Sequence, residues 1–288
     1  MAEYFALQAA LFFASSHILI RRGLVSSNAL TGSVISLGLS ALTLWIMVPF
    51  SVPLSAFMTS ASWYFLVAGL FAPGLGRTLT YVGIEKIGVA RSVPVSNCSP
   101  IVASILAVVV LGEEWRPSNI LGTCLVILGI VILSTGHSAK GSWRKADMIY
   151  PVLSAIVFGI STNLRKLGLM ISNLPLMAAA LTAATAIIFA GGMVWMRGGV
   201  RELQFTRASL GWFFAGGLVN TAAMLSAFYS LSFGKVVVVE PLISTNPVIS
   251  IVLSAIFLRD LEAITSRVVL GATLTVIGTL LVMAAARW

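Results

Sequence analysis

Charged residues are scarce in this chain of 288 residues: they make up 9% of it, whereas hydrophobic residues make up 58%. Soluble domains carry about 25% charged residues, so the composition excludes a water-soluble fold. The mean hydropathy of +1.02 agrees with this conclusion. The sequence predicts an all-α integral membrane protein, because helices satisfy their own backbone hydrogen bonds within a bilayer.

Cysteines and catalytic motifs are also missing. The two cysteines, Cys98 and Cys124, lie in apolar runs without the spacing of a zinc or redox site. We find no phosphate-binding loop, no His-Glu-x-x-His pattern and no Gly-x-Ser-x-Gly elbow. We therefore expect no metal, no cofactor and no enzymatic activity, and the missing phosphate loop argues against ATP-driven transport by this chain alone.

The chain has a net charge of +9, but its cations lie in short gaps between apolar runs and form no basic stripe. This placement excludes nucleic acid as a partner and indicates membrane topology instead. A spanning helix needs about 20 apolar residues. The sequence predicts ten transmembrane helices in a single membrane domain over residues 1–288, at 3–21, 29–50, 61–83, 89–111, 118–135, 147–165, 174–196, 209–233, 236–258 and 266–286.

The two halves of the chain resemble each other. Residues 93–100 (VPVSNCSP) align with residues 240–247 (EPLISTNP), with both prolines in register. The glycine spacing of the fifth run recurs in the tenth, at Gly122 and Gly129 and at Gly271 and Gly278. Small residues at this spacing allow close packing of helix backbones.

An internal duplication explains these matches, with repeat one over residues 1–136 and repeat two over residues 147–288. Because each repeat holds an odd number of helices, the second enters the membrane from the opposite side. We therefore expect two inverted five-helix repeats, an architecture typical of carriers.

The cations predict the orientation. Gaps after odd-numbered helices hold twelve of them, whereas the other gaps and the termini hold five. By the positive-inside rule, both termini lie outside the cytoplasm of a cell with an inner (plasma) membrane. The twelve are Arg21, Arg22, Lys86, Arg91, Lys140, Arg144, Lys145, Arg197, Arg201, Arg207, Arg259 and Arg267, and the five are Arg116, Arg165, Lys166, Lys235 and Arg287.

Two ionisable residues, Arg77 and Glu240, lie well inside apolar runs, where a charge costs at least a few kcal/mol. Arg77 either contacts a substrate or extends its side chain to the headgroups. Glu240 either takes up a proton or faces a substrate amine, or it is a neutral carboxyl kept for packing.

The paired proline segments predict a central cavity between broken helices. The alternative is that proline bends each helix while its polar neighbours join one helix to another. The candidate hinges are Pro94, Pro100, Pro241 and Pro247. The candidate cavity residues in these segments are Ser96, Asn97, Ser99, Ser244 and Asn246.

Further candidates for the cavity are polar or aromatic residues in other runs. Each has an alternative role in packing, because most aromatic residues of membrane helices only pack. They are His17, Tyr81, Asn163, Trp212, Asn220 and Tyr229.

The pattern as a whole resembles the drug/metabolite transporter superfamily, in particular carriers with two EamA repeats. The most specific residues are Leu111-Gly112-Glu113-Glu114, followed by the glycines of the fifth run. The second copy reads Leu258-Arg259-Asp260-Leu261-Glu262 and departs from the Gly-Glu pair. Within the superfamily, the chain is similar to YddG-type exporters of aromatic amino acids.

This resemblance implies alternating access through a central cavity. Carriers of this family usually have both termini in the cytoplasm, in conflict with the cation count. We expect a secondary carrier that exports amino acids, aromatic or apolar ones first, and related metabolites. The partners expected are this small-molecule substrate and the lipid bilayer, and the sequence leaves the oligomeric state open, with a monomer as one option. The alternatives are a channel-like pore and a carrier of drugs or other metabolites.

Overall fold

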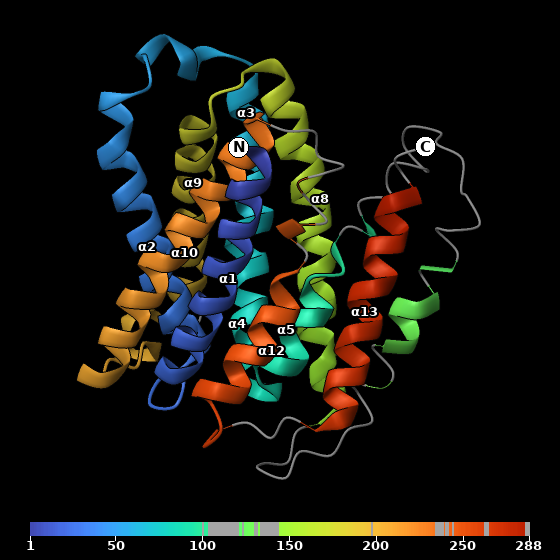
Figure 1. Cartoon of the computed structure of the whole chain (residues 1–288). Coiled ribbons are helices and arrows are strands. Elements are labelled where there is room, and N and C mark those ends of the chain that lie inside the picture. The colour runs from blue at the N-terminus through green and yellow to red at the C-terminus, as the bar shows by residue number, and fades with distance from the viewer. Residues whose placement is uncertain are drawn as a thin grey trace.

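The computed structural model describes residues 1–99, 101–102, 121–122, 124–129, 132, 144–196, 198–233, 239, 242–243, 245–261 and 265–285. Every regular element in these ranges is a helix, so the all-α prediction is confirmed for them. The helices form one bundle, with α2 and α13 at opposite edges (Figure 1).

The long helices lie where the apolar runs predict them. They are α1 (Ala2–Gly23), α2 (Ala29–Met47), α8 (Ile149–Ile171), α9 (Pro175–Met196), α10 (Arg207–Phe233) and α13 (Ser266–Ala285). The shorter ones are α3 (Ala61–Gly69), η3 (Leu70–Leu75), α4 (Gly76–Ile87), α5 (Val89–Ser96) and α12 (Asn246–Phe257). Single turns complete the list: η1 (Val48–Phe50), η2 (Leu54–Met58), η4 (Lys145–Met148) and η5 (Gly199–Glu202).

Six helical segments of the described chain are long and apolar enough to cross a membrane. The prediction of ten spans is thus supported for six of them, and the full number stays a prediction. The six are Ala2–Gly23, Ala29–Phe50, Ala61–Ile87, Lys145–Ile171, Pro175–Met196 and Arg207–Phe233.

Local sequence signals fix several helix boundaries. The side chain of Asn28 caps α2 by accepting a hydrogen bond from the Thr31 amide at 2.9 Å. Pro175 is the first residue of α9, where its missing N–H costs nothing. Gly88 separates α4 from α5 with a φ of 83°, a conformation that glycine adopts without strain.

The third apolar run is broken in its middle, which the sequence analysis did not predict. Ala72 is extended (φ −148°, ψ 124°) between α3 and α4, and Pro73 follows it without an amide to donate. In the sequence, the dipeptide Pro73-Gly74 is the feature that indicates this break in the helix. The break leaves the carbonyls of Ala68 and Ala72 free to accept hydrogen bonds from another helix.

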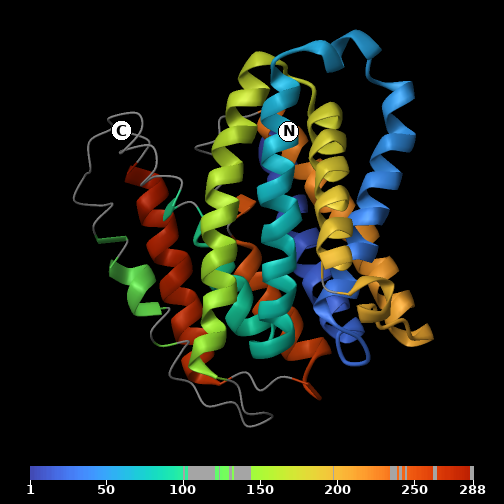
Figure 2. The same ribbon diagram turned by 180° about the vertical axis from the view of Figure 1, so that it is seen from behind.

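The two halves of the chain pack reciprocally. Helix α1 lies along α10, and α8 lies along α3, η3 and α4, so the first helix of each half contacts the third span of the other (Figures 1 and 2). The second helices, α2 and α9, contact each other. This exchange is the packing that an inverted duplication predicts.

The glycine pairs are used as the sequence predicts. A Cβ added to Gly129 would lie 2.6 Å from the carbonyl oxygen of Gly271, and one added to Gly278 would lie 2.6 Å from that of Gly122. Both values are far below van der Waals contact, so the backbones of α13 and of residues 121–122 and 124–129 touch directly.

We predict that Gly278→Ala lowers the free energy of unfolding by about 1–3 kcal/mol, because the methyl group overpacks a backbone contact. Thermal unfolding in detergent measures the change. Gly191→Ala is the matched control, because a Cβ there meets no atom within 4 Å. Equal melting temperatures for the two variants would contradict the close contact.

Candidate functional site

Arg77 is buried in the interior of the bundle. It lies in the first turn of α4, directly after the break at Ala72, and is only 5% exposed. Its Nη1 donates to the hydroxyls of Ser36 and Ser40 on α2 at 3.3 and 3.4 Å. Its Nη2 lies 3.9 Å from the sulfur of Met224 on α10. All three partners are uncharged.

A network of hydroxyls surrounds this guanidinium group. The Tyr81 hydroxyl shares a hydrogen bond of 3.1 Å with Ser36, and Ser40 shares one of 2.8 Å with Thr221 of α10. The Tyr81 hydroxyl also interacts with Ser16 of α1. Helices α1, α2 and α4 of the first half thus meet α10 of the second half at one polar cluster, which we name the Arg77 cluster.

Within the described residues, no carboxylate lies within ion-pair distance of Arg77. The alternative that its side chain extends to the headgroups does not hold, because the guanidinium points to α2 and is buried. A buried, unpaired charge is costly, and an anionic partner offsets that cost. The cluster is therefore suited to an anion.

Two more predicted residues join the Arg77 cluster. His17 of α1 is 7% exposed, and its imidazole interacts electrostatically with Arg77. The Asn220 amide donates to Ser16 Oγ at 3.4 Å, and Ser16 in turn donates to the Gly216 carbonyl at 2.9 Å. The structure thus brings His17, Arg77, Tyr81 and Asn220 together.

The aligned proline segments meet at a second place. Asn246, at the start of α12, donates to Asn97 Oδ1 at 3.2 Å, so the two predicted asparagines contact each other across the halves. Ser250 donates to Asn246 Oδ1 at 3.0 Å. Ser96 is buried, and its hydroxyl has no hydrogen-bond partner within the described ranges, whereas Ser99 is half-buried.

The prolines of these segments differ in their placement. Pro94 lies within α5, and Pro247 lies in the first turn of α12, a position where proline begins a helix without disturbing it. Four predicted residues lie outside the described part of the chain: Pro100, Glu240, Pro241 and Ser244.

Three predicted residues have other surroundings. Trp212 is 41% exposed, which suits an outward-facing aromatic residue better than a cavity wall. Asn163 donates to the Gly159 carbonyl of its own helix at 3.1 Å. Tyr229 stacks on Phe5 and Phe233, with ring centroids 5.8 and 6.3 Å apart.

Arg165 was missed as an interior residue, because the sequence analysis ended the sixth helix at residue 165. Helix α8 continues to Ile171, and the half-buried Arg165 donates through Nη2 to the Ala72 carbonyl. Ser161, one turn earlier, donates to the carbonyls of Ala68 and Ala72, both at 2.9 Å. The spacing of Ser161 and Arg165 on one helix face was the available signal.

Arg165 thus tethers the broken span just before Arg77, and its guanidinium also lies 5.4 Å from the ring centroid of Phe228.

The structure gives no support for a metal site in the part of the chain that it describes. Within the described ranges, no three His, Cys, Asp or Glu side chains are grouped to hold a metal ion.

Comparison with known proteins places the chain among transporters. The model of the EamA-like transporter family matches residues 1–135 and 146–284. The chain is 24% identical over 141 residues to a Listeria innocua protein named "Putative sugar uptake protein", covering 49% of this chain and 46% of that one. A Lactobacillus helveticus protein of the same name is 22% identical over 149 residues, covering 50% and 52%.

A shorter stretch of 61 residues is 33% identical to an "Uncharacterized transporter" of Helicobacter pylori, covering 21% of this chain and 20% of that one. The chain thus spans about half the length, or less, of these curated relatives. One crystal structure has the same fold, with a TM-score of 0.65 and 16% identity, over 99% of this chain and 97% of that one.

We predict that Arg165→Met lowers the free energy of unfolding by about 1.5–3 kcal/mol, because the Ala72 carbonyl loses a charged donor. The measurement is thermal unfolding of the purified protein. Lys166→Met is the control, because Lys166 is the exposed neighbouring cation. If both variants melt at the wild-type temperature, Arg165 does not stabilise the break.

Proposed function

The chain belongs to the EamA-like transporter family, and on this premise we propose that it is a secondary carrier of amino acids and related small carboxylates. Aromatic and apolar amino acids come first, and Arg77 binds the carboxylate. The resemblance to exporters of aromatic amino acids supports export, by alternating access through a central cavity, across the inner membrane.

The observation that carries this proposal is that no carboxylate of the described residues lies within ion-pair distance of Arg77. Its hydrogen bonds to Ser36 and Ser40, at 3.3 and 3.4 Å, are longer than the roughly 2.7–2.9 Å of charge-assisted bonds. A carboxylate offers the planar guanidinium two parallel, stronger bonds. Substrate binding therefore replaces two weak contacts with an ion pair in a site of low dielectric constant.

The position of the Arg77 cluster also supports a carrier. Three of its helices come from the first half of the chain and α10 comes from the second, so movement of one half against the other changes the site. Inverted-repeat carriers bind substrate at such an interface between repeats.

A second candidate is a sugar carrier. Two relatives are named for sugar uptake, and the hydroxyls of Ser36, Ser40 and Thr221 suit a polyhydroxylated solute. Arg77 favours the carboxylate, because a neutral sugar leaves the buried charge uncompensated. A channel-like pore is distinguished by kinetics, because its flux does not saturate.

We predict saturable, trans-stimulated uptake of labelled phenylalanine or leucine in liposomes that contain only the purified protein. Arg77→Gln lowers this uptake at least about tenfold, which corresponds to ~1.4 kcal/mol, because the carboxylate loses its ionic partner. Lys166→Gln, which removes an exposed cation, leaves the uptake unchanged. The melting temperature of each variant is measured alongside to verify folding.

Other outcomes of this experiment identify the alternatives. Stimulation by glucose but by no amino acid would replace the amino-acid carrier with the sugar carrier. Non-saturating flux would indicate a pore. Normal phenylalanine uptake by Arg77→Gln would remove Arg77 from the site.

A further inference from the structure

Two buried polar atoms beside the Arg77 cluster have no hydrogen-bond partner among the residues that the structure describes. They are Nδ1 of His17 and Oδ1 of Asn220, on side chains that are 7% and 4% exposed. An unsatisfied buried polar atom costs about 1–3 kcal/mol. Each such atom in a native structure calls for an explanation, and a ligand that binds there is one.

The orientation of the Asn220 amide follows from its neighbours. Ser16 already donates its hydroxyl hydrogen to the Gly216 carbonyl at 2.9 Å, so Ser16 Oγ can only accept from Asn220. The nitrogen of the amide must therefore face Ser16. This leaves Oδ1 as the free group, and an amide oxygen is a hydrogen-bond acceptor only.

The Asn220 side chain is linked to the proposed carboxylate site through Ser16, to which it donates and whose hydroxyl interacts with Tyr81. The next residue, Thr221, bonds Ser40, and Ser40 bonds Arg77. His17 directly follows Ser16 on α1 and is buried. In an amino acid, a single carbon separates the carboxylate from the ammonium, so acceptors for the ammonium must lie near Arg77.

We propose that Asn220 and His17 form the subsite for the substrate's ammonium group. The inference rests on the proposed function and narrows the substrate class to amino acids, as opposed to carboxylates that lack an amine. Asn220 Oδ1 accepts one ammonium hydrogen bond, and His17 Nδ1 accepts another when the imidazole is neutral. Arg77 selects the anionic end, and this subsite selects the cationic end.

The test compares phenylalanine with 3-phenylpropionate, which differs only by the missing amine. In liposomes with purified protein, the wild type should have an apparent affinity at least about tenfold higher for phenylalanine, since a charged hydrogen bond accounts for such a factor. Asn220→Leu should reduce this preference to less than about twofold and leave the affinity for 3-phenylpropionate unchanged. Asn220→Asp keeps the shape of the side chain and should increase the preference.

Ser230→Ala is the matched control, because Ser230 is a buried polar residue of the same helix that bonds the Ala2 carbonyl. It should retain the wild-type preference. A preference that survives in Asn220→Leu, or an equal loss for both compounds, would overturn the subsite but leave the carboxylate carrier intact. If the wild type transports neither compound, the proposed function fails, and the subsite with it.

A separate set of contacts closes one end of the bundle, where residues 21–28, 85–88, 198–206 and 258–261 lie together. We name it the Arg22 end. A layer of buried side chains connects it with the Arg77 cluster, since Tyr81 of that cluster packs in the same layer. At the end of α1 lie Ile18, Ile20 and Leu24, which follow His17. On α4, Ile84 follows Arg77, and on α10, Phe213 precedes Asn220. Beside them lie Ala29, Val89, Val93 and Leu258.

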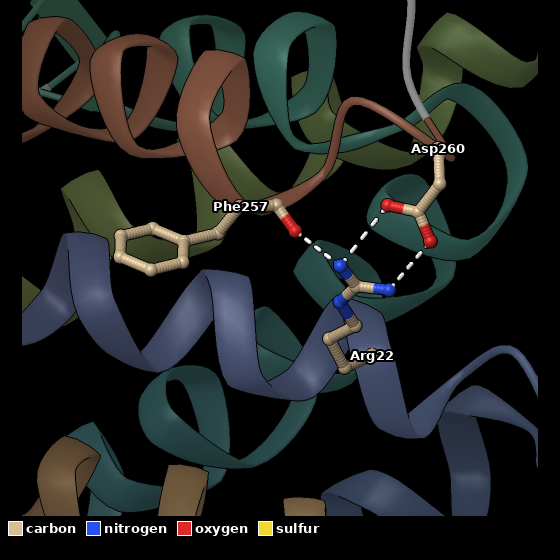
Figure 3. A network of polar contacts seen from close by, with 3 residues as sticks. All are labelled: Arg22, Phe257 and Asp260. Carbon is tan, nitrogen blue, oxygen red and sulfur yellow. Dashed lines mark hydrogen bonds and ion pairs between the residues drawn. The ribbon is translucent and has the colours of Figure 1, made fainter.

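An ion pair joins the end of α1 to the segment that follows α12 (Figure 3). Both Nη atoms of Arg22, at the end of α1, bond the carboxylate of Asp260 at 2.6 and 3.0 Å, and Nη2 also donates to the Phe257 carbonyl of α12. Nearby, Arg21 donates to the Glu85 carbonyl at 3.1 Å, and the Glu85 carboxylate accepts from the Ala29 amide at 3.1 Å.

We infer that the Arg22–Asp260 pair is a latch that holds the Arg22 end closed. It joins α1 of the first half to the segment after α12 of the second half, so separation of the halves at this end must break it. The apolar layer excludes water from the Arg77 cluster while the latch is closed. The structure therefore represents the carrier closed at the Arg22 end.

The test is the reaction rate of a cysteine in the apolar layer. Ile84→Cys, with Cys98 and Cys124 changed to Ala, is labelled in detergent with a water-soluble maleimide. Arg22→Asp or Asp260→Arg alone should raise the rate up to about fivefold, the factor for an exposed ion pair of ~1 kcal/mol. The double reversal, Arg22→Asp with Asp260→Arg, should return it towards the starting value.

Arg201→Asp is the control, because it removes an exposed cation from the same end without touching Asp260. It should leave the rate unchanged. Slow labelling in both single variants, or an additive increase in the double variant, would overturn the latch.

Discussion

The constraint on which the site depends is the burial of the Arg77 charge in a protein that crosses a bilayer. A guanidinium in such a place loses its hydration and requires partners. The hydroxyls of Ser36 and Ser40 are close to it but neutral, so they offset only part of this cost. In the proposed carrier, the serines of α2 and the broken span that carries Arg77 therefore serve a site that the carboxylate of the substrate completes.

The sequence predicts the helices well because hydropathy dominates in a membrane: α1, α2, α9 and α10 lie where the apolar runs lie. It predicts the site less well. Arg77 stood out as a charge among apolar residues, but its partners on α2 are serines like any others in the sequence. Arg165 was read as a loop residue, because hydropathy does not show that a helix continues beyond a pair of cations.

The two EamA matches cover the two halves of the chain, and the candidate site lies where the halves differ. At the spacing of the aligned prolines, Arg77 corresponds to Met224, and these two residues contact each other across the halves. One copy supplies a charge and the other a soft, polarisable sulfur. The third span is also broken in the first copy and continuous in the second, as α10. A symmetric scaffold thus holds an asymmetric site.

The reciprocal packing of α1 along α10 also has a consequence for biogenesis. During synthesis, α1 leaves the ribosome long before α10 exists, so it must remain in the bilayer without its main partner. Each helix then depends on its own hydropathy for insertion, and helix association follows as a separate stage. The mean hydropathies of 1.3 for α1 and 1.9 for α9 provide for this first stage. Interior polar residues such as Ser16 face lipid until the second half arrives, which limits how many of them one helix can carry.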